Sequence, residues 1–238
     1  MQQFLLAMAL SCTAFSFAAC PFQNQSIQCA EQQALELKTY RMDQIEPLLP
    51  LLEKWVQRAF VQYPYLWLPA QGTQYSGNLG LLAEQDAQVA LVTQGNDVLG
   101  VATVVAFGSK TFQECLGESV IEKAKELGFD PAKLLYVNYF LTAPEHLNEP
   151  HLVNMLYQQI VEYARETGKT HVCYFEGAEK ADHPLKPETM PVIEPWGHVI
   201  QGFASMNLEA DVSWPTIQGD GTVQDETHVA KFFIKGID

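Results

Sequence analysis

Apolar residues along the middle of the chain recur in a pattern that predicts a strand, a connection, a helix and a second strand. These four elements are expected at residues 134–143, 144–151, 152–168 and 170–175. The two outer segments are short apolar runs, which are typical of buried strands. In the helical segment Leu152, Leu156 and Ile160 are four residues apart and Tyr163 follows three later, so they share one helix face. The pattern therefore predicts a βαβ unit that buries one face of its helix on a sheet.

The rest of the chain from residue 35 onward contains shorter segments with similar patterns. Strands are expected at 35–41, 87–93, 98–106, 204–212 and 228–235, and helices at 51–60 and 118–127. Gln94-Gly95-Asn96-Asp97 separates two of these strands and predicts a hairpin turn. Asp43 and Glu46 have the spacing of a capping box ahead of the first helix. Together the segments predict one α/β domain over residues 35–238, a normal size for such a fold.

The N-terminal segment has the pattern of a targeting sequence. Phe4–Ala19 is apolar or small throughout, and it is shorter than the ~20 residues of a membrane-spanning helix. Because Ser16-Phe17-Ala18 is a small-x-small cleavage signal, we expect export to the periplasm, the envelope or the medium. The expected segments are a signal peptide at 1–19 and a linker at 20–34. Phe17-Ala18-Ala19-Cys20 also approximates a lipobox, which would anchor the protein to a membrane through a lipid. The alternative is a hydrophobic helix that a cytoplasmic protein keeps.

Charge and cysteine content narrow the classes of ligand. The formal net charge is −14, which argues against nucleic acid as a partner because phosphate binding needs clustered Lys and Arg. An acidic field favours amine acceptors and disfavours the polyanionic CoA nucleotide, although a negative surface also serves simply to keep a protein soluble. The five cysteines form no CxxC motif and no Cys/His zinc spacing, so no metal site is predicted.

The predicted strand–helix–strand stretch resembles motif A of the GNAT N-acyltransferase superfamily. In that motif a strand is followed by Pro-Glu-x-(Arg/Gln)-x-x-Gly-x-(Gly/Ala) and then by a helix. Pro144 and Glu145 match this pattern. Leu147 stands where Arg or Gln is expected, Pro150 where the first Gly is expected, and Leu152 where a second small residue is expected.

The resemblance extends over roughly residues 37–235. It includes the aromatic segment Tyr63–Trp67, which resembles a Phe/Tyr-Pro-Tyr-Leu motif of a bacterial subgroup. Further matching features are a helical insertion at 110–129, His183-Pro184 with Pro187, Trp196-Gly197 and an aromatic closing hairpin at 214–233. The resemblance implies an α/β (α+β) GNAT-like acyl-CoA N-acyltransferase fold, in which a central mixed sheet is flanked by helices.

The resemblance also implies a reaction and a site. An amine attacks the thioester of acetyl-CoA, and backbone N–H groups around Phe140–Thr142 polarise the thioester carbonyl. The implied cofactor-binding residues are Phe140, Leu141, Thr142, Leu147, Asn148, Pro150, His151 and Leu152. Tyr139 and Glu176 are the candidate acid–base residues, since they flank the point where the two parallel strands separate. The alternative for this pair is a packed strand aromatic and a solvated loop charge.

The connection before the long helix conflicts with binding of the CoA pyrophosphate. Residues 134–164 contain no Lys, Arg or Gly. We expect Asn148 to be the N-cap and Glu149 to lie in the first turn, where its carboxylate competes with phosphate for the helix dipole. Pro150 has no N–H to donate. Acetyl-CoA is thus the cofactor that the resemblance implies but that these residues disfavour.

Three functions remain open. The first is acyl transfer from acyl-CoA to a small amine or a protein amine. The second is a GNAT-like binding protein that has lost catalysis, which the 147–152 loop favours. The third is an exported protein whose ligand is not CoA, because acetyl-CoA is expected in a cytoplasm and not in a periplasm.

Overall fold

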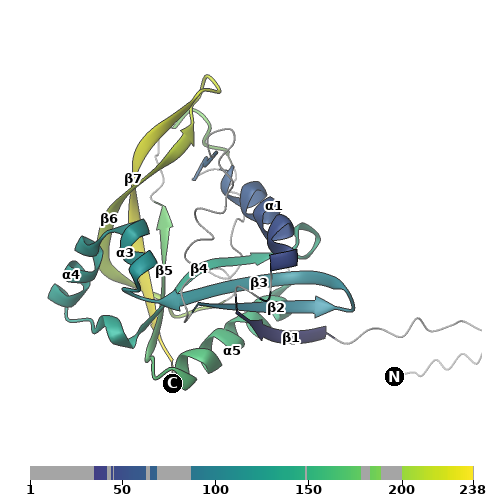
Figure 1. Ribbon diagram of the computed structural model, residues 1–238. Helices are drawn as coiled ribbons and strands as arrows, with labels where there is room; N and C mark the ends of the chain where they lie inside the picture. The colour runs from purple at the N-terminus through teal and green to yellow at the C-terminus, as the bar shows by residue number, and fades with distance from the viewer. Residues whose placement is uncertain are drawn as a thin grey trace, which may run out of the picture. The chain divides into compact units, whose positions relative to one another are not determined.

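Seven strands of the computed structural model form one mixed sheet in the order β1-β2-β3-β4-β5-β7-β6. The structure describes residues 35–41, 44, 46–62, 65–68, 87–147, 149–177, 183–188 and 200–237. The strands are β1 Leu35–Tyr40, β2 Gln88–Gln94, β3 Asp97–Ala106, β4 Leu134–Thr142, β5 His171–Gly177, β6 Ala204–Ile217 and β7 Val223–Gly236. Neighbouring strands run antiparallel except β4 and β5, which run parallel (Figure 1). The predicted α/β class and the mixed sheet are confirmed.

Four α-helices within the described residues cover the two faces of the sheet. They are α1 Leu49–Phe60, α3 Lys110–Leu116, α4 Glu118–Glu126 and α5 Pro150–Glu166; the 3₁₀ turns η2 Glu46–Leu48, η4 Pro131–Lys133 and η5 Pro144–His146 precede α1, β4 and α5. Alternate residues of the strands enter two separate cores. Val89 and Leu91 of β2 pack with α1, α3 and α4. Ala90 and Val92 of the same strand pack with α5.

The long helix α5 forms as its apolar period predicts. Leu152 and Leu156 are fully buried and Ile160 is 2% exposed. The helix lies so close to β3 that a Cβ atom on Gly100 would be 3.0 Å from Cδ1 of Leu156. Gly100 therefore allows the close approach of helix and sheet. The predicted βαβ unit is confirmed, although α5 begins at Pro150, two residues before the predicted start.

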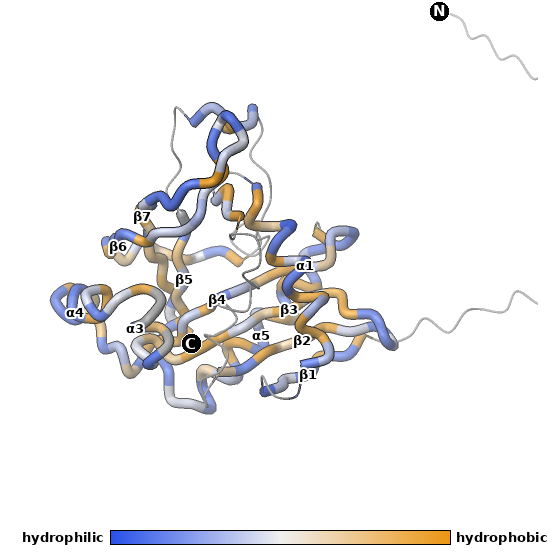
Figure 2. Tube along the Cα trace, turned by 45° about the horizontal axis from the view of Figure 1, so that its top comes forward, coloured by the Kyte–Doolittle hydropathy of each residue, from blue (hydrophilic) through white to orange (hydrophobic). Residues whose placement is uncertain are grey.

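The closing hairpin is longer than the sequence pattern predicts. Strands were expected at 204–212 and 228–235, but β6 continues to Ile217 and β7 begins at Val223. The additional pairs, from Ser213 with Thr227 to Ile217 with Val223, mix exposed polar residues with the partly buried Trp214 and the buried Thr216, so they carry no regular apolar alternation. Figure 2 shows this outer part of the hairpin coloured largely as hydrophilic. Backbone pairing holds it together, with the contacts of Trp214 and the buried Thr216.

Several predictions concern residues outside the part of the chain that the structure describes. They include the signal peptide, the linker, Asp43, Tyr63, Pro64, Asn148, Trp196 and Gly197. The expected helical insertion is present as α3 and α4, which meet at Gly117 with a φ of 89°. Among the helices that the structure describes, none is long and apolar enough to cross a membrane.

Candidate active site

The parallel strands β4 and β5 separate after three pairs of residues. Leu134, Leu135 and Tyr136 pair with His171, Val172 and Cys173. β4 then continues to Thr142 and β5 to Gly177 without pairing with each other, and Figure 1 shows the two strands diverging. Phe140–Thr142, the segment of β4 that was predicted to polarise a carbonyl, therefore does not pair with β5. We call this region the β4–β5 opening.

Backbone directions on β4 follow from one hydrogen bond at its end. The Ala143 N–H donates to the Leu99 carbonyl of the preceding strand at 2.8 Å. Because N–H and C=O groups of a strand alternate in direction, Leu141 is also directed to β3. The backbone groups of Phe140 and Thr142 are therefore directed to the opposite side, toward the β4–β5 opening. Polarisation of a thioester carbonyl by β4 requires backbone N–H groups that point in this direction.

A β-bulge at Asn138 sets which side chains face which core. Thr103 pairs with Tyr139 while Val104 pairs with Val137, so Asn138 is the extra residue. The Tyr139 N–H donates to the Thr103 hydroxyl at 3.0 Å. Tyr139 consequently faces the core below α1, where its side chain is 6% exposed and its ring centroid lies 5.7 Å from that of Phe60.

The two candidate acid–base residues lie on opposite faces of the sheet. Glu176 is exposed and accepts a hydrogen bond from the Tyr174 hydroxyl at 2.8 Å. Tyr174 belongs to the core on the α5 side, whereas Tyr139 belongs to the core on the α1 side. The structure does not bring Tyr139 and Glu176 together, so a joint acid–base pair is not supported by their placement. Their individual roles stay predictions.

The loop before α5 directs its amides to its own carbonyls. The His146 N–H donates to the Ala143 carbonyl at 2.8 Å, the Glu149 N–H to His146 at 3.2 Å, and the Leu152 N–H to Glu149 at 3.1 Å. Pro150, the first residue of the helix, has no N–H. Three amides of the loop and the first helical turn are thus satisfied internally, and Pro150 has no N–H to offer a pyrophosphate.

Glu149 is the N-cap of α5, which corrects the predicted assignment of Asn148. The helix begins one residue later than that assignment requires, because Pro150 fits the first helical position. The Glu149 side chain makes no cap hydrogen bond. Its carboxylate instead lies 2.7 Å from His146 Nδ1 and 3.4 Å from His151 Nε2.

The side chain of Leu152 lies on the buried face of the helix, as its apolar period predicts. It is fully buried in the core on the α5 side, so it adds no bulk to the loop at the position where the motif has a small residue. Taken together, the loop has a carboxylate at the helix start, a Pro at a Gly position and no Lys or Arg. These residues do not fit the pyrophosphate of CoA.

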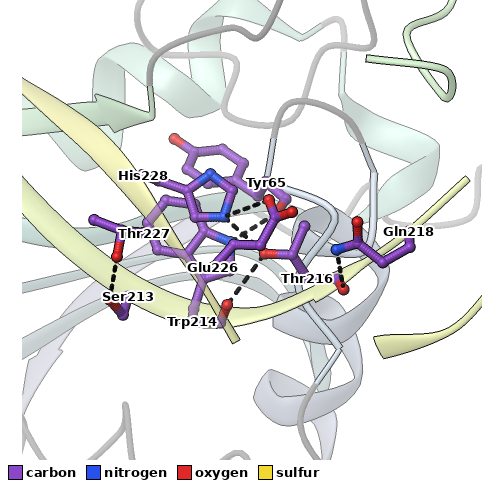
Figure 3. A network of polar contacts seen from close by, with 8 residues as sticks. All are labelled: Tyr65, Ser213, Trp214, Thr216, Gln218, Glu226, Thr227 and His228. Carbon is purple, nitrogen blue, oxygen red and sulfur yellow. Dashed lines mark hydrogen bonds and ion pairs between the residues drawn. The ribbon is translucent and has the colours of Figure 1, made fainter. Parts of the chain in front are cut away.

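An aromatic network on the α1 side of the sheet was only partly expected. Tyr65 and Trp67 belong to the predicted aromatic segment and pack against this core. The Trp214 indole N–H donates to the Tyr65 carbonyl at 2.8 Å, and the indole stacks on His228 with ring centroids 3.8 Å apart (Figure 3). The buried His228 Nε2 lies 2.7 Å from the Thr216 hydroxyl. His228 was not among the residues predicted from the sequence. It alternates with Ala230 and Phe232 on β7, and this alternation is the sequence feature that indicates a side chain facing the core.

This network lies beside the end of β5. A Cβ atom on Gly177 would be 3.3 Å from Cε1 of Tyr65 and 3.6 Å from Cη2 of Trp214. Phe60 lies between Tyr65 and Tyr139, with ring centroids 4.8 Å and 5.7 Å away. The aromatic residues therefore extend from β4 to β7 on one side of the β4–β5 opening. Within the described ranges, no group of three or more His, Cys, Asp or Glu side chains is arranged to hold a metal ion.

Comparison with solved structures identifies the fold. The chain is similar to FeeM, an N-acyl amino acid synthase from uncultured soil microbes, with 12% identity, a TM-score of 0.54, and coverage of 86% of this chain and 93% of that one. It is also similar to a putative acetyltransferase of the GNAT family from Desulfovibrio desulfuricans, with 12% identity, a TM-score of 0.47, and coverage of 86% and 100%. A third is yncA, a putative acetyltransferase from Salmonella typhimurium solved with acetyl-CoA, with 13% identity, a TM-score of 0.46, and coverage of 86% and 95%.

No protein-family model matches the chain, and no curated protein sequence matches it either. At these low identities the structural similarity shows the fold alone. The chain has the GNAT-like acyltransferase fold that the sequence resemblance implied.

Proposed function

We propose that this protein transfers an acyl group from a thioester to an amine. The observation that carries the proposal is the β4–β5 opening, at which the backbone of Phe140 and Thr142 is directed away from β3. A solved structure with the same fold belongs to an N-acyl amino acid synthase, which supports the same reaction class.

The reaction needs few side chains. The amine nitrogen attacks the thioester carbon, the negative charge on the carbonyl oxygen is stabilised by a β4 backbone N–H, and the carbon–sulfur bond then breaks. The thiolate leaves and takes up a proton that the amine nitrogen loses. Tyr139 and Glu176 remain the candidates for moving this proton, each from its own face of the sheet.

The acceptor is proposed to be a small amine or a protein amine. The aromatic network around Tyr65 and Trp214 supplies an apolar wall beside the end of β5. The net charge of −14 favours a cationic acceptor at this surface.

The test is an assay of thiol release from an acyl thioester in the presence of a panel of primary amines. Tyr139→Phe and Glu176→Gln should each be assayed, and loss of a proton-transfer group is expected to slow the reaction about 10²- to 10⁴-fold. Glu162→Gln is the matched control, because Glu162 is an exposed carboxylate on α5. Absence of amine-dependent thiol release for every thioester and amine would refute the proposal.

A second candidate function is a GNAT-like binding protein without catalysis. The observation that favours it is the region where α5 begins, in which three amides bond internally and Glu149 is the N-cap. The two candidates differ in one result: a binding protein would retain an acyl compound or an amine without releasing thiol. Export, with or without a lipid on Cys20, is part of either proposal.

A further inference from the structure

His228 is a buried titratable residue of the β6–β7 hairpin, with 4% of its surface exposed. Its ring lies flat on the Trp214 indole, with ring centroids 3.8 Å apart and ring planes 2° from parallel. Its Nε2 lies 2.7 Å from the Thr216 hydroxyl (Figure 3). The proposed acyl transfer gives this histidine no role.

The hydrogen bonds around Thr216 show which ring nitrogen of His228 carries a proton. The Thr216 hydroxyl donates its only proton to the Trp214 carbonyl at 3.1 Å. The same oxygen therefore accepts from His228, so Nε2 is protonated and donates to it. A second proton enters at Nδ1 and makes the ring an imidazolium without breaking the bond to Thr216. His228 can thus change its charge while its ring stays in place.

The residues around the ring favour its charged form. The Glu226 carboxylate of β7 lies 3.9 Å from Nε2 and is 26% exposed, so water screens its attraction only in part. The Trp214 face attracts a cation at stacking distance. β6 faces the ring with Val212, Trp214 and Thr216, which are uncharged, and the segment after α1 adds the Tyr65 phenol, whose ring centroid lies 6.1 Å from that of Trp214. Burial by itself disfavours an imidazolium, but the carboxylate and the indole face both stabilise it.

The stacked indole also holds the segment 65–68 on the hairpin. The Trp214 indole N–H donates to the Tyr65 carbonyl at 2.8 Å. Two residues further along the segment, the Leu68 N–H donates to the Pro215 carbonyl at 3.0 Å after the bridge of Trp67 to β6. The position of Trp214 therefore affects how firmly this segment is attached.

Leu66, in the middle of the segment, is held in a strained conformation. Its φ is 47°, in the left-handed region that a residue with a Cβ atom adopts at a cost in free energy. The Leu66 N–H donates to the Gln62 carbonyl at 2.9 Å, and the Leu66 carbonyl accepts the Ile217 N–H at 2.8 Å. The conformation persists because these contacts maintain it, so a weaker attachment allows Leu66 to leave it.

We propose that His228 is a pH-responsive positioning residue, whose protonated ring holds Trp214 and, through Trp214, the segment 65–68 on the hairpin. The attached state then binds a proton more tightly than the detached state. Attachment is therefore favoured at acidic pH and weakens as the pH rises through the range in which His228 loses its proton. Because Trp214 also lies against Gly177 at the end of β5, the aromatic wall beside the β4–β5 opening is held more firmly at acidic pH. This inference does not depend on acyl transfer.

The experiment is hydrogen exchange of the full chain, observed by NMR at about pH 5.5 and about pH 8, on either side of the histidine range. Rates are corrected for the intrinsic pH dependence of exchange. We expect protection of the Leu68 and Ile217 amides to be roughly tenfold higher at the acidic pH, the effect of one pKa unit. The Ala143 amide, which is bonded to Leu99 away from the hairpin, is the internal reference and should not change.

A titration of the ring resonances measures the protonation of His228 itself. Its midpoint should lie above about pH 6.5, the ordinary value for histidine. Glu226→Gln should lower this midpoint and reduce the pH dependence of amide protection. Asp225→Asn is the matched control, because Asp225 is an exposed carboxylate on the other face of β7, and it should leave both unchanged. His228→Gln should abolish the pH dependence of protection.

Equal protection at the two pH values in the wild type would overturn the inference. Greater protection at alkaline pH would also overturn it, since burial would then keep the ring neutral. A pH dependence that persists in His228→Gln would show that another group is responsible. Should that variant not fold, Glu226→Gln gives the answer: an unchanged midpoint and unchanged protection would refute the role of the charged ring.

Discussion

Glu149 places a carboxylate at the N-cap of α5, between His146 and His151. A helix start attracts an anion because its first N–H groups and its dipole are positive. In this chain the anion is a side chain of the protein itself. The absence of Lys and Arg from 134–164 was evident in the sequence, whereas the exact N-cap was not, because Asn148 and Glu149 were both compatible with a helix start.

Basic residues and a glycine in this loop, in place of the carboxylate and the proline, should create a phosphate site. In a variant with Leu147→Arg, Glu149→Lys and Pro150→Gly, we expect acetyl-CoA to bind at least about tenfold more tightly, a gain of about 1.4 kcal/mol. Leu152 stays unchanged, since it is fully buried. Calorimetry measures the gain, and Glu162→Lys controls for added charge elsewhere on α5. An equal gain in the control would show that the loop itself is not responsible.

The face on which a strand residue lies can depend on the register with the neighbouring strand, which a single sequence does not reveal. The bulge at Asn138 arises from the register between β3 and β4, and it decides that Tyr139 faces α1. Without it, strand alternation from Tyr136 would put Tyr139 on the other face. The separation of Tyr139 and Glu176 therefore became visible only in the folded chain.

At the scale of elements, α5 was predictable because its apolar residues recur strictly and the helix is long. Leu156 is fully buried and lies against Gly100. We expect Leu156→Ala to lower the free energy of unfolding by about 2–5 kcal/mol through lost burial and a cavity. Chemical denaturation measures this, with Asn154→Ala on the exposed face as the control. A change for Leu156→Ala within about 0.5 kcal/mol, the range for surface sites, would contradict the packing.

The resemblance implied a closing hairpin at 214–233, but the apolar pattern did not give the full length of its strands, because exposed polar residues alternate irregularly with Trp214, Thr216 and Ile217 there. The segment after α1 holds it by pairing. The Leu68 N–H donates to the Pro215 carbonyl at 3.0 Å, and the Ile217 N–H donates to Leu66 at 2.8 Å. Trp214 adds its indole bond to Tyr65.

This attachment can be weakened by a single change. Trp214→Phe removes the indole N–H and should cost about 0.5–1.5 kcal/mol of unfolding free energy. Ser213→Ala, at the exposed neighbouring position, should change stability less. Hydrogen exchange offers a local measure: the Ile217 and Leu68 amides should exchange faster in Trp214→Phe. Unaltered exchange at both amides would show that Trp214 does not hold the segment.

At the scale of the whole molecule, the GNAT-like fold was predicted correctly, because the order of strands and helices is readable from the apolar patterns along the chain. The N-terminal segment is a separate question. We expect protein from its native host to begin at Ala19 or Cys20, because the apolar run ends at a small-residue site. Intact mass measures the start, and recovery of uncut protein beginning at Met1 from the soluble cytoplasm would contradict export.

We propose that the residues around the start of α5 do not hold the pyrophosphate of CoA. The measurement that tests it most directly is calorimetric titration of acetyl-CoA into the wild-type full chain. We predict a dissociation constant poorer than ~1 mM, which corresponds to a binding free energy of about −4 kcal/mol. The physical reasons are the internally bonded amides, the missing N–H of Pro150 and the carboxylate of Glu149. Micromolar binding of acetyl-CoA would contradict the claim.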